Sequence, residues 1–209
     1  MLRQYSIPIG ILISLLLLLV ATQYYPGGSQ YDSNSIGYDW KHNYLSNLFA
    51  DKAVNGSYNA SRLWAVSGML FLCVSFALFF IDFPKKIPSQ AAAKVIRYCG
   101  VGAMVFAFLA VTPYHDTMIT IASTLALVSM FYIAVFVFMS RLHLLTILSV
   151  VCLLVSYTCN YMYYTKSYLE LLPIFQKLSL VISIAWILSL QYFTTMTDFT
   201  HKHRGNDGK

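Results

Sequence analysis

Charged residues are scarce in this chain. Only 11% of its 209 residues are Asp, Glu, Lys or Arg, and 58% are hydrophobic, whereas an average soluble domain is about 25% charged. With several long uncharged runs, this shortage excludes an ordinary soluble domain and indicates a multi-pass membrane protein. Long polar stretches are lacking too. The longest, at about residues 23–61, is shorter than the ~50 residues of the smallest independent domains, which leaves one membrane domain.

Motifs for disulfide, metal or nucleotide chemistry are also missing. The four cysteines lie inside apolar runs without a CxxC spacing, at Cys73, Cys99, Cys152 and Cys159. That pattern favours small buried hydrophobes over a disulfide or a structural zinc site. P-loop, dinucleotide-binding and usable Ser-His-Asp patterns do not occur. No ionisable residue is expected at the middle of a span, which argues against a proton relay or a voltage sensor.

Six apolar runs are long enough to cross a bilayer core of ~30 Å. They predict an all-α polytopic membrane protein, a bundle of six transmembrane helices, with spans at about Ile7–Ala21, Leu63–Ile81, Tyr98–Tyr114, Met118–Met139, Leu144–Tyr163 and Leu171–Phe193. The first run is expected to stay as a helix, because no small-residue cleavage pattern follows it. The membrane domain is expected over residues 1–197, with a cytoplasmic tail at 198–209.

The net charge of +6 does not indicate a nucleic acid partner, because most basic residues flank the spans. Nine fall on one side of the predicted bundle, at Arg3, Lys85, Lys86, Lys94, Arg97, Arg141, Lys202, Arg204 and Lys209. Four fall on the other side, at Lys41, Lys52, Arg62 and Lys166, and Lys177 lies near the start of the last span. Since cytoplasmic loops carry the excess of Lys and Arg, both termini are expected in the cytoplasm, and the loop at 23–61 is expected outside.

One part of that loop, "GYDWKHNYLSNLFAD" at 37–51, concentrates polar side chains between apolar ones. At 100° per residue, one helix face would carry Asp39, His42, Asn43, Ser46 and Asn47. The opposite face would carry Trp40, Tyr44, Leu45 and Leu48. This spacing predicts an amphipathic helix at about 39–49, with Asp39 accepting hydrogen bonds from the amides of its first turn. Its polar face either meets water and headgroups or turns inward over a cavity.

Other polar residues are expected at the same outer end of the bundle. The connection "TPYHDT" places His115 and Asp116 between the third and fourth spans, and Arg62 opens the second. The ligand-binding candidates are therefore Asp39, His42, Asn43, Ser46, Asn47, Arg62, His115, Asp116 and Lys177. His42 and His115 are expected either to approach one shared ligand or to face water separately.

The outer segments carry a resemblance. "YPGG", "GYDWKHNYLSNLF" and "NGSYNASRLWAVSGMLFL" resemble a group of bacterial six-helix membrane proteins of unknown function, and more distantly the damage-regulated autophagy modulator-like membrane proteins. The resemblance covers most of residues 24–135. It implies the six-helix architecture, a bacterial plasma membrane, and matching polar positions at His42, Asn43, Ser46, Asn47, Leu48 and His115. This chain departs from the pattern at Asn47, where an acidic residue is frequent, and at Phe49, which replaces a glycine.

Three functions fit these features. The first is a non-enzymatic membrane module, without a cofactor, whose outer polar residues bind a lipid headgroup, a small molecule or a partner protein. The alternative is a metal-dependent hydrolase at the outer leaflet, with zinc held by side chains such as His42, His115, Asp39 and Asp116. A small transporter is a further alternative, although the two halves of the chain do not match as internal repeats would.

Overall fold

The computed structural model describes residues 2–200, with side chains from residue 5 onward. Its long helices are α1 (Leu2–Gln23), α2 (Arg62–Asp82), α3 (Gln90–Leu109), α4 (His115–Met139), α5 (His143–Thr165) and α6 (Leu172–Phe193). Short elements are the 3₁₀ helices η1 (Leu45–Phe49) and η2 (Phe83–Lys86), and α7 (Met196–Thr200). The six long helices are long and apolar enough to cross a membrane. The predicted all-α fold with six membrane-spanning helices is confirmed.

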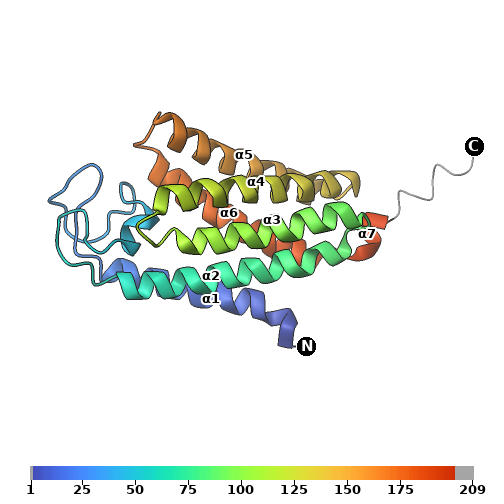
Figure 1. Cartoon of the computed structure of the whole chain (residues 1–209), viewed down its shortest axis with the longest axis horizontal. Coiled ribbons are helices and arrows are strands. Elements are labelled where there is room, and N and C mark those ends of the chain that lie inside the picture. Colours follow the sequence, from blue (N-terminus) through green and yellow to red (C-terminus); the bar gives the residue numbers. More distant parts are fainter. Residues whose placement is uncertain (1, 201–209) are drawn as a thin grey trace, which may run out of the picture.

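The six helices run side by side as an up-and-down bundle (Figure 1). One end of the bundle, here called the loop end, carries the connection between α1 and α2. The opposite end, the tail end, carries the start of α1 and α7. Neighbours along the chain pack together, most extensively α1 with α2, α3 with α4, and α5 with α6. The tail expected at 198–209 begins inside α7, and residues 201–209 lie outside the described residues.

Aromatic side chains fill the core between the helices. Phe79 is fully buried, and its ring centroid lies 5.2 Å from that of Phe83 and 6.0 Å from that of Trp186. The indole nitrogen of Trp186 donates to the Ser149 hydroxyl at 2.8 Å, which satisfies the one polar atom of this large ring. By contrast, α5 exposes large apolar side chains such as Leu144 along its outer face, as a lipid-facing helix does.

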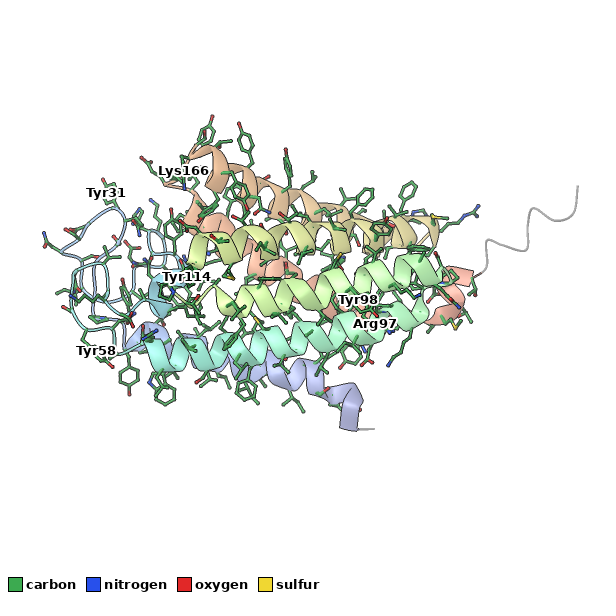
Figure 2. The ribbon with its side chains drawn as sticks, in the orientation of Figure 1. Tyr31, Tyr58, Arg97, Tyr98, Tyr114 and Lys166 are labelled. Carbon is green, nitrogen blue, oxygen red and sulfur yellow. The ribbon has the colours of Figure 1, made fainter. Side chains whose placement is uncertain are left out.

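Basic and aromatic side chains mark the two ends of the bundle (Figure 2). Tyr31, Tyr58, Tyr114 and Lys166 lie at the loop end, and Arg97 lies toward the tail end. Tyrosines at the ends of membrane spans keep an apolar ring in lipid while the hydroxyl reaches water. The described ends of the helices therefore have the chemistry of membrane–water boundaries.

Lys86, a residue expected only to set membrane orientation, also closes the end of α6. Its ammonium donates to the carbonyl oxygens of Leu190 at 3.2 Å, Gln191 at 2.9 Å and Thr194 at 2.9 Å. The last carbonyls of a helix have no partner within the helix and must be satisfied from outside. Lys86 provides those donors and joins the end of α2–η2 to the end of α6.

The amphipathic helix predicted at 39–49 is wrong in extent. The Asn43 amide donates to the Asp39 carbonyl at 2.8 Å and closes a single turn. Tyr44 then has an extended backbone, with ψ of 152°, and only Leu45–Phe49 is helical, as 3₁₀ helix η1. Asparagine side chains compete with the helical backbone. Here the Asn47 side-chain oxygen accepts the Tyr44 amide at 2.7 Å. Helical structure is therefore interrupted at Tyr44 and begins again at Leu45.

Candidate functional site

Residues 24–61, here called the cap, fold back on themselves over the loop end. The Val54 amide donates to the Tyr25 hydroxyl at 3.0 Å, and the Gly28 amide donates to the Ser35 carbonyl at 2.7 Å. Gly28 has a φ of +80°, and a Cβ there would lie 2.8 Å from the Val54 carbonyl carbon, so this crossing requires glycine. The fully buried Leu48 packs with the ends of α1 and α2. The cap is therefore a structured layer.

Asp39 organises the turn that precedes η1. Its carboxylate accepts the Lys41 amide at 2.8 Å, the His42 amide at 3.2 Å and the His42 Nδ1–H at 2.7 Å. The predicted capping role of Asp39 is confirmed, for a turn instead of a helix. Partial burial raises the pKa of Asp39, but the hydrogen bonds from His42 and from the two amides outweigh burial, so the pKa lies below its usual value. Tyr31 stacks on the His42 ring at 4.9 Å between centroids.

Asn43 is fully buried inside the cap. Its side-chain nitrogen donates to the Gly28 carbonyl at 2.8 Å, and its side-chain oxygen accepts the Asp39 amide at 2.8 Å. The Asn43 carbonyl accepts from the Tyr38 hydroxyl at 3.2 Å. A buried amide costs free energy unless it is hydrogen-bonded, and these contacts satisfy it. Asn43, a predicted ligand-binding residue, thus holds three parts of the cap together.

Lys177 joins the cap to α6. Its ammonium donates to the Asn43 carbonyl at 2.6 Å and lies 5.6 Å from the centroid of the Tyr38 ring. The neighbouring Gln176 supports the same junction, because its side-chain oxygen accepts the Leu45 amide at 2.9 Å. Lys177 was also a predicted ligand-binding residue. In the structure its charge meets carbonyl oxygen and an aromatic face within the protein.

Three cavities meet at Ser46 and His115, which contribute to the lining of all of them. The inner cavity, of about 180 Å³, lies beneath η1. A second cavity, of about 360 Å³, extends toward Arg62, and a third, of about 370 Å³, extends toward Asp116. Pockets that bind small molecules are mostly apolar with a few placed polar groups. Ser46 and His115 are the polar groups common to this set.

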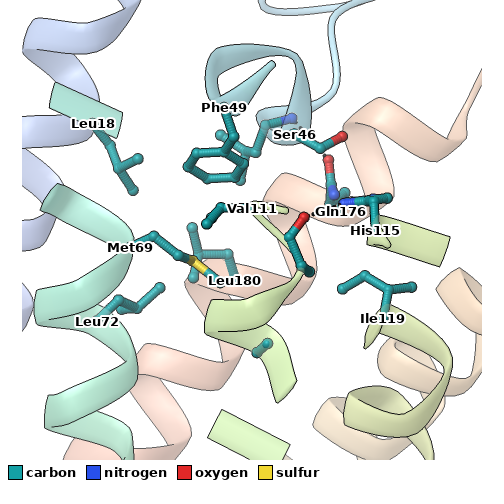
Figure 3. A pocket seen from close by; sticks show the side chains of 13 residues that line it. Leu18, Ser46, Phe49, Met69, Leu72, Val111, His115, Ile119, Gln176 and Leu180 are labelled. Atoms are coloured by element: carbon teal, nitrogen blue, oxygen red, sulfur yellow. Dashed lines mark hydrogen bonds between the residues drawn. The ribbon is translucent and has the colours of Figure 1, made fainter. Parts of the chain in front are cut away.

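The inner cavity has a polar side and an apolar side (Figure 3). Ser46, His115 and Gln176 gather on one side, from η1, α4 and α6. The other side is formed by apolar side chains from α1, α2 and α6, among them Leu18, Met69, Leu72 and Leu180. The cavity therefore has the amphiphilic lining of a site for a molecule with one polar and one apolar part.

His115 has a defined hydrogen-bonding role. Its Nδ1 lies 2.7 Å from the Ala110 carbonyl oxygen, and a carbonyl can only accept, so the Nδ1 carries the proton. In the neutral ring the Nε2 is then an acceptor. This hydrogen bond crosses the short connection between α3 and α4 and sets the orientation of the His115 ring.

The two charged candidates nearest these cavities have partners within the protein. Arg62 forms an ion pair with Asp51, and its Nε donates to the Phe49 carbonyl at 3.1 Å. Asp116 accepts the Tyr163 hydroxyl at 2.5 Å. These contacts hold the walls of the second and third cavities. Asn47 also supports the wall of the second cavity, where it caps η1.

His42 lies in a different place from His115. It lines a fourth cavity, of about 300 Å³, beside Tyr31 and Glu170, and none of the four cavities is lined by both histidines. Within residues 2–200, no three His, Cys, Asp or Glu side chains are grouped so that they could hold a metal ion. The weak zinc candidates Asp39, His42, His115 and Asp116 therefore do not form a ligand set.

Sequence reasoning missed Gln176 as a functional candidate. The available signal was a polar pair, Gln176 and Lys177, within an apolar span. Comparison of the chain with protein families, with curated proteins and with solved structures finds no match. The candidate site therefore rests on the geometry of Ser46, His115 and Gln176.

Proposed function

We propose that this membrane protein is a non-enzymatic module that binds a lipid-like small molecule beneath its cap. The meeting of three cavities at Ser46 and His115 carries this proposal. Two further features support it: the apolar side of the inner cavity, and the attachment of the cap to α6 through Lys177 and Gln176. A binding site at one end of a membrane-spanning bundle is accessible to molecules that partition into a bilayer leaflet.

We also propose that the loop end faces outward across a bacterial plasma membrane, with both termini in the cytoplasm. The excess of basic residues on the opposite side supports this orientation. The resemblance of the outer segments to bacterial six-helix membrane proteins supports a bacterial plasma membrane as the location. A membrane-impermeant maleimide added to intact cells should label Ser57→Cys, on the exposed part of the cap, and leave Gln90→Cys at the start of α3 unlabelled. Labelling in the reverse pattern would contradict the orientation.

Native mass spectrometry of the protein purified in a mild detergent tests the binding function. The wild-type protein should retain an amphiphile of lipid-like mass, bound at one per chain. Ser46→Trp should lose at least ~90% of that species, because an indole at position 46 would fill the place where the three cavities meet.

Ser57→Trp is the matched control, since Ser57 lies on the exposed surface of the cap. It receives the same added volume and should retain the amphiphile. Equal retention by Ser46→Trp and Ser57→Trp, or no retained amphiphile in the wild-type protein, would refute the proposed function.

A further inference from the structure

The inner cavity is free of charge along its lining. Asp, Glu, Lys and Arg are absent from the residues around it, and His115 is its one titratable side chain, although Asp51, Arg62, Asp116 and Lys166 line the adjoining cavities. A charged group that enters such a space loses its hydration without gaining an opposite charge. The inner cavity therefore disfavours a carboxylate, a phosphate or an ammonium group.

The polar side of the inner cavity offers both donors and acceptors. When the His115 ring is neutral its Nε2 accepts, because the Nδ1–H is donated to the Ala110 carbonyl. The Gln176 side-chain oxygen is occupied by the Leu45 amide, which leaves its NH₂ group as the donor toward the cavity. The Ser46 hydroxyl can do either. A hydroxyl or a neutral amide, which donates and accepts at once, matches all three.

The apolar side limits the size of the other part of the ligand. The cavity volume of about 180 Å³ is close to the ~150 Å³ of an engineered apolar cavity that stays dry and binds benzene. Space of this size accepts one hydrocarbon chain segment or one ring. Leu18, Met69 and Leu180, from three different helices, would surround that segment.

We propose that the inner cavity binds an uncharged, hydroxyl-bearing amphiphile of the class of a long-chain alcohol. Its hydroxyl donates to His115 Nε2 and accepts from the Gln176 amide or the Ser46 hydroxyl, and its hydrocarbon lies against Leu18 and Leu180. This inference rests on the proposed function, which requires that the cavity beneath the cap be a binding site, and it adds the chemical class of the ligand.

Photolabelling in lipid nanodiscs tests the head-group chemistry with three probes of equal chain length: octanol, octane and octanoate, each carrying a diazirine. Octanol should label peptides that line the inner cavity, such as those containing Met69 or Leu180, at least ~5-fold above either other probe. Excess unlabelled octanol should suppress that labelling. Octanoate labelling equal to that of octanol would overturn the uncharged assignment, and octane labelling equal to that of octanol would overturn the hydroxyl assignment.

Two conservative variants locate the contact. Gln176→Glu keeps the acceptor for the Leu45 amide but replaces the NH₂ donor by a carboxylate, and Ser46→Ala removes only a hydroxyl. Each should reduce octanol labelling several-fold, while Asn160→Leu, in the adjoining cavity alone, should leave it unchanged. Unchanged labelling in both variants would refute the assigned contacts. If native mass spectrometry finds a bound amphiphile but octanol does not label the cavity, the proposed binding function is supported and the assignment of an uncharged, hydroxyl-bearing ligand is refuted.

Discussion

Replacing Asn59 by Asp should unfold the cap and lower the free energy of unfolding by about 3 kcal/mol or more. Asn59 is 1% exposed. Its NH₂ group donates to three carbonyl oxygens, those of Asn47 at 3.0 Å, Leu48 at 3.3 Å and Ala50 at 2.9 Å. A carboxylate would place negative charge against the three acceptors and remove the donor to the Asn47 and Ala50 carbonyls, while the Ser61 hydroxyl still reaches the Leu48 carbonyl at 3.2 Å. Each buried unsatisfied group costs about 1–3 kcal/mol. The lost hydrogen bonds are those that hold η1 and the residue after it, Ala50.

The matched control is Asn55→Asp in the same loop. Asn55 is exposed, and its side-chain oxygen accepts the Ser57 amide at 3.0 Å, a bond that a carboxylate can also make. Unfolding by sodium dodecyl sulfate in mixed micelles should show a large loss for Asn59→Asp and a change below about 0.5 kcal/mol for Asn55→Asp. Limited proteolysis should then cut the cap of Asn59→Asp first. Equal stability of the two variants would mean that the Asn59 contacts do not hold the cap.

The six spans could be predicted because a bilayer requires long apolar runs, and such runs are a local property of the sequence. The acceptor role of Asp39 was also local, since Asp39 binds amides two and three residues ahead, although a single turn follows it in place of the predicted helix. Both predictions needed only neighbouring residues. The structure confirms them for that reason.

The cap and its cavities depend on contacts between distant segments, which residue spacing does not report. Lys177 reaches Asn43 across 134 positions, and Gln176 reaches Leu45 across 131. The helical wheel of 39–49 assumed that polar side chains seek water or a ligand. Instead, Asn43 and Asn47 bind the backbone of the cap, which ends the helix early and buries part of the expected polar face. The inner cavity is lined by residues of η1 together with residues of α1, α2, α3, α4 and α6, which are far apart in the sequence.

Gly100 lets α3 approach the Phe80 ring on α2, and Gly100→Ala should lower the free energy of unfolding by about 1–2 kcal/mol. An added Cβ would lie 2.8 Å from the Phe80 Cβ and closer still to two ring carbons. Phe80 is 3% exposed and packs against Phe79 at 5.2 Å between ring centroids, so the ring has little room to move. Overpacking of this kind costs about 1–3 kcal/mol, which exceeds the gain of up to ~1 kcal/mol from replacing a helical glycine.

Gly102→Ala, two positions along the same helix, isolates the cause. A Cβ at Gly102 would meet only the end of the Leu125 side chain, at 3.3 Å, and a terminal methyl can shift by a few tenths of an ångström. The helix gain should then dominate, and Gly102→Ala should be neutral or up to ~1 kcal/mol more stable than the wild type. A second variant, Gly100→Ala with Phe80→Leu, should recover stability relative to Gly100→Ala because the smaller side chain vacates the contact. If Gly100→Ala and Gly102→Ala change stability equally, the close packing of α3 on Phe80 does not set the stability of the bundle.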